Sequence, residues 1–178
     1  MSDKVQETKE DGLSSELNRM SEIVCRRPNA DEAEALCALM RQMLMTSFPT
    51  FPPEAINDYL KPWTPDHVRS RLERGHDILV AAYADDELIG LASGTAPEAG
   101  VGTIVWLLID GAWRDRKAGR ALYGAACHAY RDLGAHKVKL TAPSERAKRF
   151  YEACGMRVEG FHSNHWYKME FFSLGMDL

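Results

Sequence analysis

The chain has 178 residues, of which 45% are hydrophobic and 27% are charged, so it can bury one sizeable core as an ordinary globular protein does. The formal net charge of -4 argues against the broad positive surface that general binding to nucleic acids or anionic membranes requires. Any site for phosphate groups must therefore be local.

Residues 1–20 differ in character from the rest of the chain. They hold few hydrophobic side chains and more acidic than basic ones, which predicts a mobile N-terminal tail before a single domain over residues 21–178. No apolar signal segment begins the chain, and no later run approaches the roughly 20 apolar residues that cross a bilayer. We therefore expect a cytoplasmic protein without a membrane partner.

The cysteines are Cys25, Cys37, Cys127 and Cys154. They lack the paired spacing of a zinc site or a thiol redox site, so we expect them to be reduced, buried and chemically inert. His162 and His165 have the spacing of a metal pair. Because no third ligand accompanies them, we interpret them as exposed loop residues and expect no metal.

The first part of the chain predicts a short strand, a helix, a connection and a second helix. Asn29, with Glu32 three residues later, is a helix cap after a strand at residues 21–27. Apolar residues at helical spacing predict a helix that ends before Phe48. Four prolines in residues 48–63 favour an irregular connection. Thr64 then caps a helix that begins at Pro65 and ends near residue 74, before Gly75.

The remaining segments alternate between strands and helices. Two apolar segments around a short turn predict a hairpin, and an alanine-rich apolar face predicts a helix that Gly134 terminates. The predicted strands are 76–83, 87–95, 102–109, 137–141, 157–161 and 166–171, and the predicted helices are 119–133 and 144–154. This order indicates a mixed α/β fold with one sheet flanked by helices.

A basic turn joins the strand that ends at Ile109 to the helix that begins near Gly119, with the sequence GAWRDRKAGRAL. Four basic side chains stand against one carboxylate, which gives a local charge of +3. The first N–H groups of a helix lack partners and its dipole favours anions, so a pyrophosphate can bind there, and Gly119 lets the backbone approach closely. A solvated charged loop is the competing interpretation.

The segments WRDRKAGRALYGAA and SERAKRFYEACGM together resemble the core of the GNAT superfamily of N-acetyltransferases. In that family a Q/R-x-x-G-x-G/A turn binds the pyrophosphate of acetyl-CoA, and Arg114, Lys117 and Gly119 stand at its defined positions. The cofactor-binding residues that the resemblance implies for this turn are Arg114, Asp115, Arg116, Lys117, Ala118, Gly119 and Arg120.

Lys117 departs from the family pattern, which has glycine at this position. Its side chain could block a backbone contact or add a cation for the phosphates. Because lysine adopts helical dihedral angles without strain, we expect binding to persist unless the position requires a positive φ.

The second motif carries the residue implied for catalysis. In similar enzymes the tyrosine at the place of Tyr151 faces the sulfur of acetyl-CoA, so its phenol can protonate the departing thiolate. Spacing alone favours a packing role for Tyr151 on its helix. Ser144 replaces the family asparagine, and we expect it to cap the helix and to contact the cofactor weakly.

The resemblance covers about residues 21–172 and implies an α/β (α+β) fold, with a twisted, mostly antiparallel sheet of six or seven strands and about four helices. Acetyl-CoA, the co-substrate, enters a gap between the central strands. Leu107, Leu108 and Ile109 match the strand whose backbone binds the cofactor and whose N–H groups can polarise the thioester carbonyl. A neutral amine then attacks the thioester directly.

The general base is left unassigned, since Lys139 stands where some family members carry glutamate. The candidates near strand ends are Glu98, Asp110, His162 and His165.

The acceptor side is expected in the proline-rich connection, where aromatic residues suggest an apolar wall. They are Phe48, Phe51, Tyr59 and Trp63. A small-molecule amine, or one like an amino acid, is the expected acceptor, and ordinary packing is the competing interpretation of these residues. Homodimer formation stays open.

Three hypotheses follow. The first is an acetyl-CoA-dependent N-acetyltransferase. The second is a non-catalytic CoA-binding module, and the third is a protein-interaction domain whose basic turn docks an acidic partner. The negative net charge disfavours a nucleic-acid partner.

Overall fold

The computed structural model describes residues 22–114 and 117–178, so the predicted tail at residues 1–20 lies outside the described residues. Within these two ranges the chain forms seven strands and five α-helices. The strands are β1 (Ile23–Arg26), β2 (Ile78–Ala84), β3 (Glu87–Glu98), β4 (Val101–Ile109), β5 (Lys137–Ala142), β6 (Arg157–His162) and β7 (Phe171–Asp177). The helices are α2 (Ala33–Ser47), α3 (Pro53–Leu60), α4 (Pro65–Arg74), α5 (Ala118–Asp132) and α6 (Glu145–Ala153), with 3-10 turns η1 (Ala30–Glu32), η2 (Gly111–Trp113) and η3 (Trp166–Lys168).

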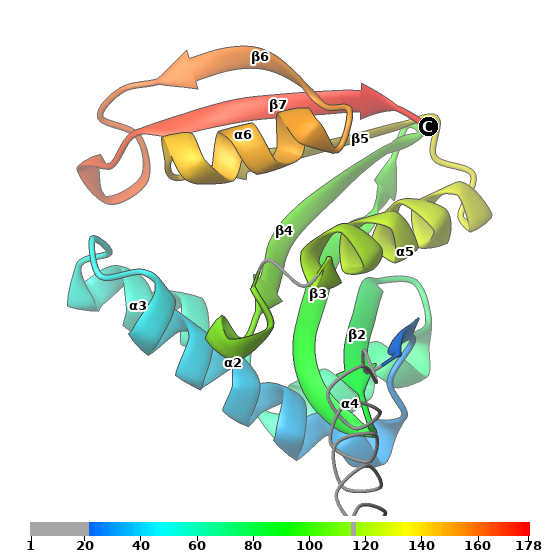
Figure 1. Cartoon of the computed structure of the whole chain (residues 1–178). Coiled ribbons are helices and arrows are strands. Elements are labelled where there is room, and N and C mark those ends of the chain that lie inside the picture. The colour runs from blue at the N-terminus through cyan, green and yellow to red at the C-terminus, as the bar shows by residue number, and fades with distance from the viewer. Residues whose placement is uncertain (1–21, 115–116) are drawn as a thin grey trace, which may run out of the picture.

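The strands form one sheet in the order β1-β2-β3-β4-β5-β7-β6. Neighbouring strands are antiparallel except β4 and β5, which run parallel. The predicted α/β fold with a mixed, mostly antiparallel sheet is therefore confirmed. Figure 1 shows β5, β7, β6 and α6 at one end of the molecule and α2, α3 and α4 toward the other.

The two parallel strands pair over only a short stretch. Val101–Thr103 of β4 lies against Lys137–Lys139 of β5, and no further pairs join the two strands. A register shift between β3 and β4 leaves Val105 as an extra residue, and such a bulge bends a strand. From Ile104 onward, β4 pairs with β3 on one side, while no described strand pairs with its other side. Backbone groups on that edge are therefore available to a ligand.

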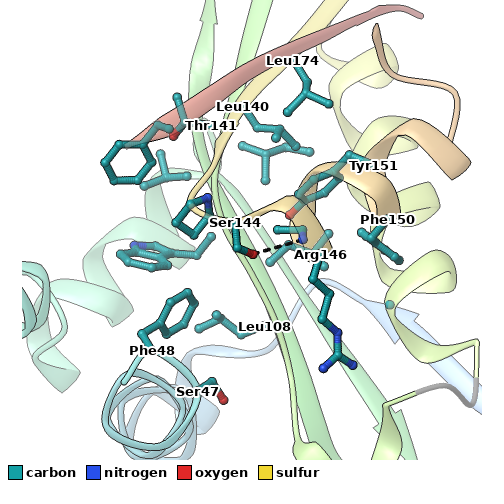
Figure 2. A pocket seen from close by; sticks show the side chains of 18 of the residues that line it. Ser47, Phe48, Leu108, Leu140, Thr141, Ser144, Arg146, Phe150, Tyr151 and Leu174 are labelled. Carbon is teal, nitrogen blue, oxygen red and sulfur yellow. Dashed lines mark hydrogen bonds between the residues drawn. The ribbon is translucent and has the colours of Figure 1, made fainter. Parts of the chain in front are cut away.

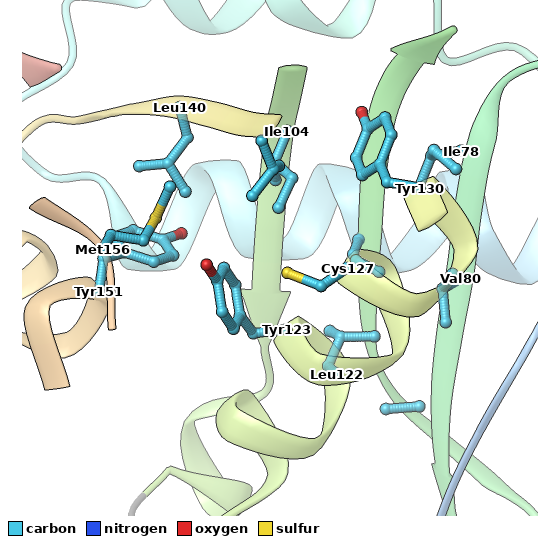
Figure 3. Packing of buried hydrophobic residues seen from close by; sticks show 14 of the residues in the cluster. Ile78, Val80, Ile104, Leu122, Tyr123, Cys127, Tyr130, Leu140, Tyr151 and Met156 are labelled. Carbon is cyan, nitrogen blue, oxygen red and sulfur yellow. The ribbon is translucent and has the colours of Figure 1, made fainter. Parts of the chain in front are cut away.

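Hydrophobic cores lie on both faces of the sheet. Along β2, Ile78 and Val80 pack in a cluster with residues of α5 and α6, whereas Leu79 and Ala81 pack with α2 and α4. This alternation is what the period of two along a strand requires of a sheet covered on both faces. Figure 3 shows the α5 side of the first cluster.

Tyr130 is a large side chain of α5 in that cluster, and it is fully buried. Its hydroxyl donates to the carbonyl oxygen of Thr103 over 2.6 Å and lies 3.1 Å from that of Thr95. The ring lies directly over Gly94 and Gly102, where a Cβ would overlap it. Glycine at these two strand positions therefore makes room for Tyr130.

The helix and hairpin signals around α4 and β2 predicted the structure well. Thr64 caps α4 by accepting from the His67 N–H over 3.4 Å, and Gly75 ends the helix with a φ of 73°. Asp85 and Asp86 form the tight turn before β3 with φ values of 47° and 66°. Both are short polar residues that tolerate this left-handed region.

Two predictions of secondary structure were wrong. The connection at residues 48–63 contains the helix α3, because Pro53 occupies its first position, where a helix requires no N–H donor. The last strand is β7, which begins at Phe171, whereas the first half of the predicted strand at residues 166–171 is the turn η3. Tyr167 and Lys168 have positive φ values there, and no sequence signal marks them.

The four cysteines are free, as predicted, but only Cys127 is buried and the other three are partly exposed. In the described part of the chain, no helix has both the length and the apolar character that a membrane crossing needs.

Candidate active site

A cavity of about 1390 Å³ opens where β4 and β5 diverge, and we call it the central cavity. It is lined by β4, the turn before α5, β5, α6, the end of α2, α3, and the segment from β6 to β7. Figure 2 shows Ser47 and Phe48 at the end of α2, Thr141 on β5 and Tyr151 on α6 around this space.

Most of the predicted cofactor-binding residues line the central cavity. They are Leu107, Leu108, Ile109, Arg114, Lys117, Gly119, Arg120 and Ser144, and the predicted catalytic residue Tyr151 joins them. The side chain of Ala118 lies instead in the core, fully buried at the start of α5. Asp115 and Arg116 lie outside the described residues. The structure therefore brings the two sequence motifs to one cavity.

Cationic side chains surround the amino-terminal end of α5. Arg114 donates to the Ser47 hydroxyl over 2.6 Å, and Arg120 donates to the carbonyl oxygen of Ala153 over 2.9 Å. Arg146, in the first turn of α6, also lines the cavity, and the sequence analysis did not single it out. The only sequence feature that could have indicated Arg146 is its place two positions after Ser144, the residue that caps α6. The cavity thus offers a cluster of cations to an anionic ligand.

Lys117 has a φ of 65° and a ψ of -1°, which is the left-handed region. Lys117 therefore meets the exception stated in the sequence analysis, because this position has a positive φ. A side chain in this region costs about 1 kcal/mol, because Cβ crowds the following carbonyl oxygen. This cost explains why a glycine suits the position before α5.

Gly119 lies where α5 approaches α6. A Cβ on this residue would lie 3.3 Å from the ring of Phe150 and 3.9 Å from a side-chain carbon of Ile109. The missing side chain therefore lets Phe150 pack close to the cofactor turn. It also leaves the backbone of the first turn of α5 open to the cavity.

Ser144 caps α6, as predicted, by accepting from the Ala147 N–H over 3.2 Å (Figure 2). The hydroxyl lies at the cavity wall, so capping and contact with a ligand are compatible.

Tyr151 projects from α6 into the cavity lining, although only 8% of its surface is exposed. Its ring packs against Phe150 at 5.0 Å and against Tyr123 at 5.9 Å between ring centres. Burial, and to a smaller extent the neighbouring Cys154, raises the pKa of the Tyr151 phenol far above its usual range. The phenol therefore stays protonated at physiological pH and can donate a proton or a hydrogen bond.

The four candidate bases do not line the central cavity. Asp110 accepts from the Ala112 N–H and from Gln42, and Glu98 ends β3 beside the hairpin turn. His162 and His165 stack on each other with ring centres 5.0 Å apart. The ring nitrogen of His162 lies 3.1 Å from the hydroxyl of Ser173, which does line the cavity.

The described residues contain no cluster of three metal-ligating side chains.

Aromatic rings form one side of the central cavity, and we call this set the aromatic wall. Its members are Phe48, Phe51, Tyr59, Trp106 and Tyr167, all of which line the cavity. Adjacent ring centres are 4.8 to 6.0 Å apart, from Phe51 through Phe48 and Trp106 to Tyr59 and Tyr167. Three of the four aromatic residues predicted for the acceptor side belong to it. Trp63 is buried in the core with α2 and α4.

The comparisons with known proteins agree with this geometry. A model of the acetyltransferase (GNAT) family matches residues 38–156. The PaiA N-acetyltransferase from Thermoplasma acidophilum, solved in complex with coenzyme A, is 17% identical with a TM-score of 0.75, covering 88% of this chain and 99% of that one. A GNAT-family acetyltransferase from Streptococcus pneumoniae is 18% identical with a TM-score of 0.73 and the same coverage.

A third structure, an aminoglycoside 6'-acetyltransferase type Ii, is 16% identical with a TM-score of 0.66, covering 86% of this chain and 96% of that one. At these identities the structures show a shared fold. No curated protein sequence matches the chain. The family model spans well over half of the chain, which therefore belongs to the GNAT acetyltransferase family and is an acyltransferase with acetyl-CoA as co-substrate.

Proposed function

We propose that the protein transfers an acetyl group from acetyl-CoA to the primary amine of a small molecule. The observation that carries this proposal is the central cavity itself, which joins the cationic turn before α5, the free edge of β4 and the Tyr151 phenol to the aromatic wall. One end of the cavity suits phosphates and the other suits an organic acceptor. Acetyl-CoA supplies an acetyl group already activated as a thioester.

The cationic end holds the phosphates in this proposal. Arg114, Lys117, Arg120 and Arg146 line that part of the cavity, and the first N–H groups of α5 add their partial positive charge. The edge of β4 from Ile104 to Ile109 provides backbone donors and acceptors for the pantetheine amides. A backbone N–H at this edge can also donate to the thioester carbonyl oxygen, which favours attack at its carbon.

Tyr151 donates the proton that the leaving sulfur needs. Its raised pKa keeps the phenol protonated, so its hydroxyl can donate to the sulfur as negative charge develops there. Among the described residues its hydroxyl has no hydrogen-bond partner, so the donor is free to turn toward a ligand in the cavity.

The acceptor must lose a proton before it attacks. Glu159 is the only carboxylate among the described lining residues, and it forms an ion pair with Lys137. The excess of cations in the cavity favours the neutral form of a bound amine over the ammonium form. We therefore propose that the amine passes its proton to solvent, with no dedicated side chain as the base.

The aromatic wall and the structures with a similar fold support a small-molecule acceptor. The aminoglycoside acetyltransferase in that group is named for a small-molecule amine acceptor. Here the wall and the cavity volume accommodate one small organic molecule beside the cofactor.

Thiol release from acetyl-CoA, followed across a panel of small amines, tests the proposal. We expect amine-dependent release together with a rise in thermal stability on adding acetyl-CoA or CoA but not ATP. Indifference of the protein to both CoA forms would contradict the proposal. Binding of CoA without transfer to any amine would indicate a CoA-binding module.

A further inference from the structure

The acceptor end of the central cavity carries more information than its size. The aromatic wall lines this cavity, and so do polar side chains of β5 and β7. We propose that the acceptor carries a carboxylate and an aromatic ring beside its amine, as an aromatic amino acid does. This inference rests on the proposed acetyltransferase function and names the substrate class of the same site.

The aromatic wall is held in place by contacts from three separate parts of the chain. The ring of Tyr59 on α3 packs edge-on against Trp106 of β4 at 5.1 Å and against Tyr167 of η3 at 5.6 Å. The Tyr167 hydroxyl donates to Asp58 over 2.8 Å. Tyr167 also has a φ of 53°, a conformation that needs support from its surroundings. The wall is thus a preformed surface suited to a flat ring.

Lys139 of β5 provides a positive charge in the cavity. Its side chain is exposed and lines the cavity, and among the described residues it has no ion-pair or hydrogen-bond partner. Thr141, two residues further along the same face, and Ser173, paired with Thr141 on β7, also line the cavity. An ammonium group flanked by two hydroxyls is a suitable site for a carboxylate.

The neighbouring acid does not neutralise this cation. The carboxylate of Glu159 lies over Gly175 and is paired with Lys137, which does not line the cavity. Glu159 lies beside Lys139 across the sheet, because Gly175 pairs with Lys139, but it forms no ion pair with Lys139, so the ammonium group remains available to a ligand. The cations at the other end of the cavity face the phosphates in the proposed function, so they do not compete for the acceptor.

The same charges argue against acceptors with several amino groups. A polycationic amine needs carboxylates, and Glu159 is the only one that the described lining residues provide. Each additional ammonium group would lie in the same cavity as the Lys139 ammonium group, with no further described carboxylate to pair with it. In this arrangement the acceptor's carboxylate binds Lys139 and its ring packs on the aromatic wall. Its amine then faces the remaining part of the cavity, which β4 and Tyr151 line.

A matched panel of amines tests this inference on the full-length protein loaded with acetyl-CoA. Phenylalanine contains all three groups, phenylethylamine lacks the carboxylate, alanine lacks the ring, and spermidine represents the polycations. We expect kcat/KM for phenylalanine to exceed that for each of the other three by about tenfold or more. A factor of this size corresponds to the loss of one charged hydrogen bond or of one buried aromatic contact.

Substitutions identify the residues that cause the expected preference for phenylalanine. Lys139→Met should raise KM for phenylalanine about tenfold and leave phenylethylamine unchanged. Lys148→Met is the matched control, because Lys148 pairs with Glu145 on α6 and does not line the cavity. Tyr59→Leu, or Tyr167→Leu near the surface, should raise KM for phenylalanine but not for alanine.

The outcomes separate the two proposals. If the protein neither binds acetyl-CoA nor acetylates any amine, the proposed function fails. If it binds acetyl-CoA but treats phenylethylamine or spermidine as well as phenylalanine, only the substrate class fails. If the protein binds acetyl-CoA but does not acetylate phenylalanine, calorimetric titration of phenylalanine into the CoA-loaded protein shows whether the amino acid binds. Absence of binding, or binding without acetylation, also overturns the substrate class.

Discussion

Arg114, in the turn proposed to hold the cofactor phosphates, donates to the hydroxyl of Ser47 at the end of α2 over 2.6 Å. The residues are 67 positions apart, so the contact ties the cofactor turn to the helix that leads into the aromatic wall. Arginine has five N–H donors, and one bond to Ser47 leaves others for a phosphate. Ser47 therefore acts as a support that orients the guanidinium before the ligand arrives.

Removing this support should weaken cofactor binding. We expect Ser47→Ala to raise the KM for acetyl-CoA about two- to fivefold at unchanged kcat, because one hydrogen bond to a cation no longer orients Arg114. Steady-state kinetics with varied acetyl-CoA measures the effect. Thr46→Ala is the control, since the Thr46 hydroxyl donates to the carbonyl oxygen of Gln42 within α2. Equal effects of both substitutions would refute the role of Ser47.

Tyr151→Phe tests the proton donor. The variant keeps the ring that packs against Phe150 and Tyr123, and we expect kcat to fall about 100-fold, which is typical of a lost general acid. The unfolding temperature and the affinity for CoA should change little. Tyr123→Phe is the matched control, because Tyr123 is equally buried, its pKa is also raised by burial, and it does not line the cavity. A fully active Tyr151→Phe enzyme would exclude the proposed role.

Local sequence signals predicted much of this fold and much of the candidate site. The cap at Thr64, the stop at Gly75 and the cap at Ser144 depend on neighbours in the chain, and each lies where it was expected. The basic turn and Tyr151 were found through motifs with a fixed spacing. Non-local contacts escaped prediction, because no local pattern encodes them.

The aromatic wall shows why the rest could not be predicted. Trp106 and Tyr167 join it through contacts with Tyr59, 47 and 108 positions away along the chain. The sequence analysis placed Trp106 in a strand, as observed, and Tyr167 in the second strand of the final hairpin, where the structure has the turn η3. The polar face around Lys139 was missed for the same reason, since only the pairing of β5 with β7 brings Ser173 beside Thr141.

The strain at Lys117 predicts an unusual response to substitution. Lys117→Gly should raise the free energy of unfolding by up to about 1 kcal/mol, because glycine accepts a positive φ without cost, partly offset by its greater freedom in the unfolded chain. Lys117→Val should lower it, since a β-branched residue is disfavoured in this region. Urea denaturation measures both. Lys117→Asn, which tolerates this region, separates backbone strain from loss of charge in parallel assays of acetyl-CoA binding.

The Arg26–Glu32 pair predicts how stability depends on acidic pH. Hydrogen bonds from Arg26, and then from Tyr83 and the Asn29 N–H, lower the pKa of Glu32 from 4.5 to about 2. A lowered pKa in the folded state means that the stabilisation is present above pH 4.5 and is lost as the pH falls toward 2.

Glu32→Gln should therefore flatten the pH dependence of unfolding in that window, relative to the unsubstituted protein. Thermal unfolding at a series of pH values measures the slope. Glu73→Gln, on the exposed part of α4, should keep the original slope. An unchanged slope in Glu32→Gln would show that Glu32 titrates alike in the folded and unfolded chains.

Two glycines predict opposite effects of the same chemical change. At Gly102 in β4 an added Cβ would overlap the ring of Tyr130, which is fully buried and bonded through its hydroxyl to Thr103. The ring cannot retreat without losing that bond, so Gly102→Ala should lower the free energy of unfolding by about 2–3 kcal/mol.

At Gly124 in α5 the added methyl group meets nothing within 4 Å. Gly124→Ala should raise it by about 0.5–1 kcal/mol, because alanine loses less backbone freedom in a helix. Urea denaturation of the two variants against the parent chain gives both signs, and destabilisation by both would show that α5 does not tolerate a side chain on its exposed face.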